Sequence, residues 1–316
     1  MRYNPRARLD RSQVQNRRGG GGGGRGGGFP IGAGGGGGGL RVGGGLGGVL
    51  VLVVIYLVFQ LAGGGGGTGT GGADQGSGTG TGTGNTSLDQ CRTGADANQD
   101  SDCALVADVN SVQAYWADTL PEQSGVGYTE AQTTIFDGGV STGCGNASAD
   151  VGPFYCPVDK HVYLDTTFFK DMLEGQLGAR GGPFSQAYVL AHEYGHHVQD
   201  LLGTMGKVRT QKGESSDAVR LELQADCYAG MWTKSATTAD DEGGEPYIVD
   251  LTQDDVERAL DAAAAVGDDR IQRRSSGRVD PDSWTHGSAE QRMRWFQTGL
   301  QKGTLEGCDT FSADRL

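Results

Sequence analysis

The sequence predicts an α+β fold, mostly helical, for a single domain over residues 91–316 that follows a single transmembrane helix. Three observations support this prediction. Most of the 59 glycines in the 316-residue chain lie before about residue 84, so little apolar side chain is left there for a core. Within that part, residues 46–62 form an apolar run that carries no charge. The rest of the chain has segments of helical and of strand periodicity, and it is long enough for one domain with a core.

Residues 1–44 are predicted to be a disordered, Arg/Gly-rich cytoplasmic segment. They hold eight arginines and one aspartate, a net charge of +7, which leaves −20 for the rest of a chain whose total is −13. An acidic domain of this size does not favour nucleic-acid binding. The "RRGGGGGGRGGG" stretch could still be an RNA-binding arm, but a neighbouring membrane segment explains the arginines more simply.

Residues 45–63 are predicted to be that transmembrane anchor, because their apolar run is long enough to span a bilayer with its glycine flanks. A buried core helix would have nothing to pack on between glycine tracts. A signal peptide would have a shorter apolar core and a clear cleavage site. The arginines before the run predict a cytoplasmic N-terminus and an extracytoplasmic domain, joined to the anchor by a flexible Gly/Thr-rich linker over residues 64–90.

All six cysteines follow the predicted anchor, and an even number on the exported side favours disulfides. The shortest loops predict the pairs Cys91–Cys103 and Cys144–Cys156, which leaves Cys227–Cys308. The alternative, a zinc-binding cysteine cluster, lacks any Cys-x-x-Cys pair.

The first half of the domain is expected to combine one helix with a small sheet. A helix is predicted over residues 108–121, ending at Pro121. Strands are predicted over 133–140 and 161–169, with a short helix over 166–174.

The second half is expected to be helical. Helices are predicted over 185–203 with Ser185 as N-cap, over 215–236, over 251–267 with Thr252 as N-cap, and over 288–303 with a Ser-x-x-Gln capping box.

The stretch "AHEYGHHVQ" predicts a metal site on the helix that follows Ser185. His192 and His196 are four residues apart, so both imidazoles lie on one face and can bind one ion. His197 lies about 140° around the helix from His192 and is expected to point elsewhere. Glu193 flanks the first ligand, where it can take a proton from a metal-bound water.

A catalytic zinc with two histidines needs a third protein ligand. No histidine follows within "VQDLLGTMGKVRTQ", which excludes the three-histidine class. The next helix contains "LELQADC", in which Glu222 and Asp226 share a face. Glu222 is therefore the expected third ligand to Zn²⁺. Asp226 is expected to accept the free ring N–H of a ligand histidine.

Four blocks in order, "GPFYCPVDKHVYLD", "AHEYGHHVQ", "RLELQADCYAG" and "SWTHGSAEQRMRWF", give the chain a family resemblance over residues 87–316. They resemble the bacterial neutral zinc metallopeptidases that carry an N-terminal anchor. The resemblance implies a zincin-like metallopeptidase domain with the third ligand in a Glu-x-x-x-Asp helix, which maps to Glu222 and Asp226. The long glycine runs depart from the family pattern, but they lie outside the predicted domain.

The expected function is that of a membrane-anchored zinc metalloendopeptidase acting on peptides or proteins. Glu193 would serve as general base, and His286 is the candidate second donor to the oxyanion. By analogy with zincins, residues 160–165 would form the edge strand along the substrate. Three further side chains, His161, Tyr194 and Tyr228, are expected to be structural. The alternative is a catalytically silent, zinc-stabilised assembly protein of the cell envelope. The sequence gives no oligomeric state.

Overall fold

The computed structural model describes residues 1–18, 88–148 and 151–316. The predicted anchor over 45–63 and almost all of the predicted linker therefore lie outside the described residues. Within the part of the chain that is described, no helix is long and apolar enough to cross a membrane.

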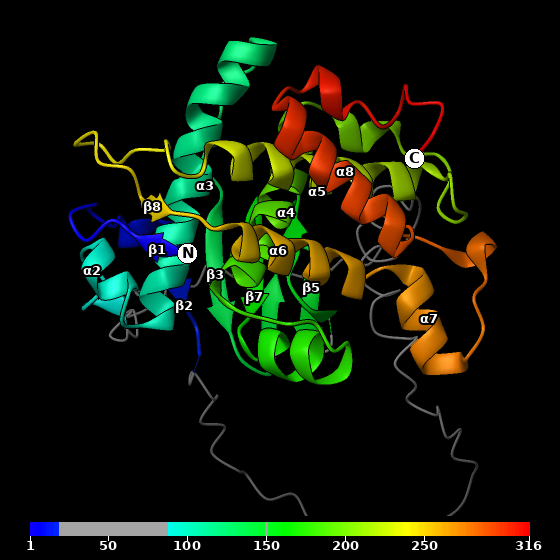
Figure 1. The fold of residues 1–316 in the computed structure, drawn as a ribbon, viewed down its shortest axis with the longest axis horizontal. Helices are drawn as coiled ribbons and strands as arrows, with labels where there is room; N and C mark the ends of the chain where they lie inside the picture. The colour runs from blue at the N-terminus through cyan, green and yellow to red at the C-terminus, as the bar shows by residue number, and fades with distance from the viewer. Residues whose placement is uncertain (19–87, 149–150) are drawn as a thin grey trace, which may run out of the picture.

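The described residues form an α+β fold, as predicted (Figure 1). Their largest sheet has the strand order β2-β3-β7-β6, in which β2, β3 and β7 are parallel and β6 is antiparallel to β7. In Figure 1 helix α4 lies at the centre of the molecule, with α5 and α8 above it and β3 and β7 below. The helix that carries the predicted metal ligands packs against α3, α5 and α6 and against strand β6.

The strands are short, and half of those described belong to this sheet, while β1 pairs with β8 and β4 with β5. They are β1 (Arg2–Tyr3), β2 (Val14–Asn16), β3 (Gln132–Phe136), β4 (Gly139–Thr142), β5 (Gly145–Ser148), β6 (Phe154–Cys156), β7 (His161–Asp165) and β8 (Ile248–Asp250).

The helices supply most of the fold. They are α2 (Gly94–Ala97), α3 (Ser101–Ser124), α4 (Pro183–Leu201), α5 (Asp217–Ser235), α6 (Gln253–Ala265), α7 (Asp268–Ser276) and α8 (Ala289–Lys302). Tight or widened turns add η1 (Arg11–Gln13), η5 (Phe168–Gln176), η6 (Thr204–Lys207), η7 (Pro281–Ser283) and η8 (Glu306–Cys308).

The chain start differs from the prediction. Residues 1–18 were expected to be disordered within 1–44, but they form β1, η1 and β2 against the domain, so that prediction is wrong for them. β1 pairs antiparallel with β8, and β2 pairs parallel with β3. Tyr3, Ala7, Leu9 and Val14 are buried in the core. Arginines separate these apolar residues, and a glycine tract follows them. The average composition of residues 1–44 therefore does not reveal that they form part of a core.

Two helix boundaries also differ. The helix predicted over 108–121 is the longer α3, which runs through Pro121 and ends at Gly125, where φ is 72°. A left-handed glycine, rather than the proline, therefore stops it. Helix α4 begins at Pro183 after Gly182, so Ser185 is not its N-cap. The Ser185 hydroxyl instead donates to the carbonyl oxygen of Arg258.

The other predicted caps and all three predicted disulfides are confirmed. Thr252 and Ser288 each form a capping box at the start of α6 and α8. The disulfides are Cys91–Cys103, Cys144–Cys156 and Cys227–Cys308. The last of these fastens α5 to the segment that follows α8.

Glycines bring α5 and α8 into backbone contact. A Cβ on Gly299 would lie 1.8 Å from the carbonyl oxygen of Cys227, and one on Gly230 would lie 2.0 Å from that of Phe296. No larger residue fits either position without separating the helices. This packing fixes the spacing between the two helices that carry Asp226 and Arg292.

Candidate metal centre

The structure brings the three predicted ligands together. His192 and His196 on α4 and Glu222 on α5 offer ligand atoms that all lie within 4.8 Å of one another. His192 Nε2 is 3.2 Å from one carboxylate oxygen of Glu222, and His196 Nε2 is 3.5 Å from the other. All three side chains are buried. Two residues at i, i+4 spacing on one helix and a single residue on the next helix thus place their ligand atoms around one point.

The two histidines are held by their other ring nitrogens. His192 Nδ1 donates to Asp226 Oδ1 at 2.8 Å, as expected for Asp226, and His196 Nδ1 donates to Gln199 Oε1 at 2.8 Å. Each Nε2 atom faces the Glu222 carboxylate, and in the neutral imidazole with its proton on Nδ1 it is the nitrogen that can bind a metal. Two imidazole nitrogens and one carboxylate are also the donor set of a catalytic zinc site. The residues present therefore fit Zn²⁺.

Gln199 was missed by the sequence reasoning, although it lies only three residues after His196. Its amide N–H₂ group donates to the carbonyl oxygen of Leu221 and to Gln224 Oε1 on α5. With both of these donated bonds directed to α5, its oxygen is oriented toward the histidine. A polar residue one turn after the second ligand was the available signal.

Asp226 is the centre of a buried hydrogen-bond network. It accepts from Arg292 Nε at 2.8 Å, from an Arg292 terminal nitrogen at 2.9 Å, and from the Tyr188 hydroxyl at 2.5 Å. Burial alone would raise the pKa of Asp226, but Arg292 and His192 lower it to about 2. Asp226 is thus an anion locked between α4, α5 and α8. Tyr188 and Arg292 were not predicted, because no local pattern links them to the metal motif.

Glu193 lies in the same cavity as the three ligands. The cavity is lined by these residues together with His286, Arg292, Tyr188 and a wall of apolar and small residues: Val151, Gly152, Pro153, Phe168, Val189 and Val266. Burial raises the pKa of Glu193. A carboxylate with a raised pKa in a largely apolar cleft is a stronger base than one in water.

His286 also reaches this cavity, from the loop before α8. It is buried, and its Nδ1 lies 2.9 Å from the Thr285 hydroxyl and 3.5 Å from Asp268 Oδ1. The other oxygen of Asp268 accepts the backbone N–H groups of Thr285, His286 and Gly287. Burial alone would lower the pKa of His286, but Glu222 and Asp268 raise it. Asp268, another residue that sequence reasoning missed, therefore holds the whole loop in place.

The remaining predicted side chains lie away from the ligands. His197 is turned from the metal site as expected: its Nε2 donates to the carbonyl oxygen of Thr129, and its Nδ1 is 3.0 Å from the Tyr155 hydroxyl. His161 is not among the residues that line the cavity. The Tyr194 hydroxyl is 2.9 Å from Thr133 Oγ1 on β3, and the Tyr228 ring packs against Trp116.

The predicted edge strand needs correction. Residues 160–165 contain β7, which lies between β3 and β6 and is not at an edge. The edge strand beside β7 is β6, which follows Gly152 and Pro153 of the cavity wall. The β-branched and aromatic residues of β7 predicted a strand correctly. They could not show its position, since inner and edge strands of this length have similar composition.

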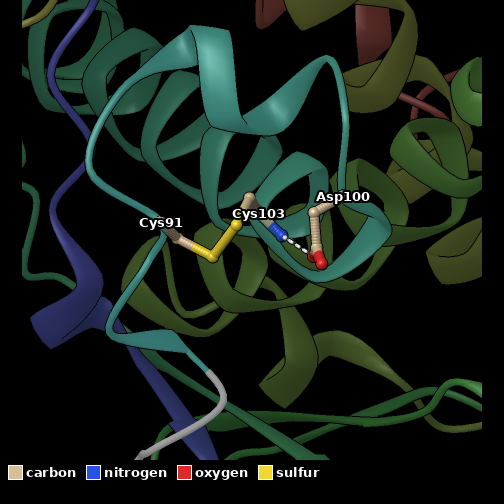
Figure 2. Close-up of side chains that lie close together, drawn as sticks. All are labelled: Cys91, Asp100 and Cys103. Atoms are coloured by element: carbon tan, nitrogen blue, oxygen red, sulfur yellow. Dashed lines mark hydrogen bonds between the residues drawn. A yellow bond between two sulfur atoms is a disulfide. The ribbon is translucent and has the colours of Figure 1, made fainter.

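A second group of ligand-type residues, Cys91, Asp100 and Cys103, does not form a metal site (Figure 2). The two cysteines form a disulfide, so neither is a thiolate. Asp100 caps α3 by accepting the backbone N–H groups of Asp102 and Cys103. The alternative of a zinc-binding cysteine cluster is therefore excluded for the described cysteines.

Helices α4 and α5, which carry the predicted ligands, approach each other closely at a glycine. A Cβ on Gly195 would lie 3.1 Å from Cα and from the carbonyl oxygen of Ala225. Gly195 stands between the two histidine ligands, and Ala225 stands one residue before Asp226. Small residues on both helices therefore bring Glu222 within reach of the histidines.

Comparison with known proteins identifies the family. The model of the family described as "Putative neutral zinc metallopeptidase" matches residues 1–311. An uncharacterised protein of Mycobacterium tuberculosis H37Rv is 54% identical over 231 residues, covering 72% of this chain and 77% of the relative. The uncharacterised protein YpfJ of Escherichia coli K12 is 45% identical over 196 residues, covering 60% of this chain and 64% of the relative. No solved structure was found to match. The chain belongs to the neutral zinc metallopeptidase family.

Proposed function

We propose that this protein is a zinc-dependent metalloendopeptidase. One observation carries the proposal: a buried general base, Glu193, shares a cavity with two histidines and a glutamate whose ligand atoms converge on one point. The family match supports a peptidase. A site built only for structural zinc would close with a fourth protein ligand and would need no base.

His192, His196 and Glu222 would hold the zinc ion. When bound, zinc lowers the pKa of a water molecule toward about 7 and polarises the carbonyl group of the scissile bond. Asp226 and Gln199 keep the two imidazoles in the neutral tautomer that binds metal.

Glu193 would take a proton from the attacking water and return it to the nitrogen of the leaving amine. Both proton transfers fit a carboxylate whose pKa burial raises. The apolar side of the cavity, with Val189 and Phe168, would exclude other water from the reaction.

His286 would donate a hydrogen bond to the carbonyl oxygen as that oxygen becomes negative. Glu222 and Asp268 together raise the pKa of His286 against the effect of burial, and Asp268 fixes its loop, which favours a protonated imidazole that is already in position. The rigid loop means that little reorganisation is needed during the reaction.

The cavity wall suggests which peptides would be cleaved. Val151, Pro153, Val189 and Val266 surround the reacting centre on one side. An apolar side chain next to the scissile bond would therefore bind there more favourably than a charged one. Strand β6 would pair with an extended segment of the substrate.

The domain would act outside the cytoplasm. Its three disulfides favour an oxidising compartment. The prediction of a membrane anchor concerns residues 45–63, and it stays a prediction.

Metal removal tests this function. The full-length protein should bind about one zinc ion and cleave an unfolded protein substrate. A chelator should abolish cleavage, and added zinc should restore it. A protein that binds one zinc ion at this site but cleaves none of a broad panel of unfolded proteins and peptides would instead support the silent assembly protein.

A further inference from the structure

The structure assigns residues 1–18 to the same folded domain as residues 88–316. From this we infer that both parts of the chain lie on the same side of any membrane. A single crossing between them, with a cytoplasmic N-terminus and an exported domain, would separate strands that are paired in the fold. This inference does not depend on the proposed peptidase activity.

Backbone pairing joins the two parts along most of the N-terminal segment. Arg2 and Tyr3 pair with β8, and residues 14–16 pair with β3. Between these strands, the Leu9 N–H donates to the carbonyl oxygen of Arg92, and the Gly94 N–H donates to that of Ala7. A Cβ on Gly94 would lie 2.0 Å from the carbonyl oxygen of Asn4. The loop closed by the Cys91–Cys103 disulfide therefore fits directly against the segment.

Helix α3 presents buried polar groups whose partners come from this segment. Asp108 is 3% exposed, and it accepts a hydrogen bond of 2.9 Å from the Tyr3 hydroxyl. Asn110 is 2% exposed; its oxygen accepts the Asp10 N–H, and its N–H₂ group donates to the carbonyl oxygen of Asp10 and to Gln13 Oε1. Without residues 1–18 these groups would lose those bonds, and buried polar groups are rarely left unpaired. The surface of α3 is therefore built to be covered by the segment.

Charge complementarity gives the N-terminal arginines a role within the fold. Arg6 pairs with Glu245 at 3.1 Å, Arg11 pairs with Asp89 at 3.0 Å, and Arg18 pairs with Asp102. Pairs at or near the surface contribute little energy each. They do show that the basic segment matches an acidic domain. An arginine-rich segment before an apolar run need not therefore indicate a cytoplasmic location.

The N-terminal segment is also linked through β3 to α4, the helix that carries the two predicted histidine ligands. Val14 of β2 pairs with Thr133 of β3, and the Thr133 hydroxyl lies 2.9 Å from that of Tyr194, the residue after Glu193. The family match from residue 1 includes this segment as well. Residues 1–18 are thus positioned to affect the site without touching it.

Labelling in intact cells tests the shared location. Arg6→Cys and Val158→Cys place single thiols on the segment and on the domain, at side chains that are 78% and 64% exposed. A membrane-impermeant maleimide should label both variants to the same extent, relative to permeabilised cells. Since the disulfides favour export, we expect both to be labelled. The unsubstituted protein, whose described cysteines are all in disulfides, is the control.

Labelling of only one of the two thiols in intact cells would overturn the inference. Protection of both would leave the shared side intact and would contradict only the proposed location outside the cytoplasm. The two proposals can therefore fail separately.

Cleavage of the connection provides a second test. A protease site inserted within residues 63–72 of the full chain allows the two parts to be separated covalently after purification. The N-terminal fragment should then co-elute with the domain in size-exclusion chromatography. Val14→Asp, which places a charge at a position that is 1% exposed, should release the fragment. The neighbouring Gln15→Ser, at a half-buried position, should not. Release of the fragment from the unsubstituted protein, or its equal retention by Val14→Asp, would contradict the inference.

Discussion

Arg292 on α8 binds both carboxylate oxygens of Asp226 on α5, at 2.8 and 2.9 Å. Asp226 in turn accepts the Nδ1–H of His192 on α4. One buried ion pair therefore links the position of a predicted metal ligand to a helix that holds no ligand. The contact between Gly299 and Cys227 sets the distance between the two helices.

The first prediction concerns this pair. Arg292→Met should lower the free energy of unfolding by about 3–5 kcal/mol, because it leaves the buried Asp226 carboxylate without its main counter-charge. It should also weaken zinc binding by about 10–100-fold, because His192 is then less firmly oriented. Denaturant unfolding and competition with a chelator measure the two effects. Arg294→Met removes a partly exposed arginine on the same helix and should change stability by less than about 1 kcal/mol. Equal effects of the two substitutions would refute the role of Arg292.

The second prediction concerns the general base. Glu193→Gln should lower the rate of peptide cleavage by at least about 100-fold, since the amide cannot accept the proton of the water. Zinc content and melting temperature should change little, because Glu193 is not among the predicted ligands. Glu214→Gln, at an exposed position before α5, is the matched control and should retain full activity. Undiminished cleavage by Glu193→Gln would rule out the proposed mechanism.

The third prediction concerns the second donor. His286→Ala should lower kcat by about 100-fold or more while zinc binding is retained, because a donor to the developing negative charge is lost. Asp268→Asn should lower kcat less, because its side chain can still accept backbone N–H groups of the loop. His161→Ala changes a histidine that does not line the cavity and should leave kcat unchanged. If His286→Ala lost zinc together with activity, His286 would be a ligand and not an oxyanion donor.

The fourth prediction concerns helix spacing. Gly299→Ala should destabilise the protein by about 1–3 kcal/mol or more, because its Cβ would meet the carbonyl oxygen of Cys227 at 1.8 Å. Thermal unfolding measures this loss. Gly127→Ala adds the same methyl group where nothing lies within 4 Å, and it should be nearly neutral. A neutral Gly299→Ala would show that α5 and α8 can separate freely.

The fifth prediction concerns acid stability. Asp241 accepts backbone N–H groups of Arg8, Gly243 and Glu245; burial alone would raise its pKa, but these bonds lower it. A carboxyl group with a lowered pKa in the folded state stabilises the fold above its unfolded pKa of about 3.9, and this contribution disappears as the pH falls through the folded pKa. Asp241→Asn should therefore cost stability at pH 6 and lose less on acidification than the unsubstituted protein. Urea unfolding between pH 6 and pH 3 measures the difference, and parallel curves would contradict the assignment.

Local helix geometry was enough to predict the two histidines at the centre of the site. His192 and His196 followed from residues one turn apart on one helix, whereas Glu222 followed from the need of a catalytic zinc for a third ligand and from the family's Glu-x-x-x-Asp pattern. The caps at Thr252 and Ser288 were as local as the histidine pair. These local features are readable because each depends on residues within a few positions of one another.

The partners that complete the site could not be read in this way. Arg292 lies 66 residues from Asp226 and 100 residues from His192. Nothing in the sequence near Arg292 distinguishes it from Arg294, the other arginine of α8. The position of β7 inside the sheet likewise depends on β6 and β3, whose order only the folded chain reveals. The prediction of disorder for residues 1–18 failed for the same reason, because their strands pair with β8 and β3, which are distant in sequence. The adjacent glycine tract also masked the apolar residues of this segment.

The pairing of β1 with β8 has a consequence for the time at which the protein can finish folding. Arg2 and its partner Asp250 are 248 residues apart, so Arg2 leaves the ribosome long before Asp250 does. At about 5–20 residues per second, roughly 12–50 s of synthesis separate them. Tyr3 must wait through that interval before β8 exists to pair with it. Strand β1 can therefore complete its pairing only after residues as late as 250 have been synthesised.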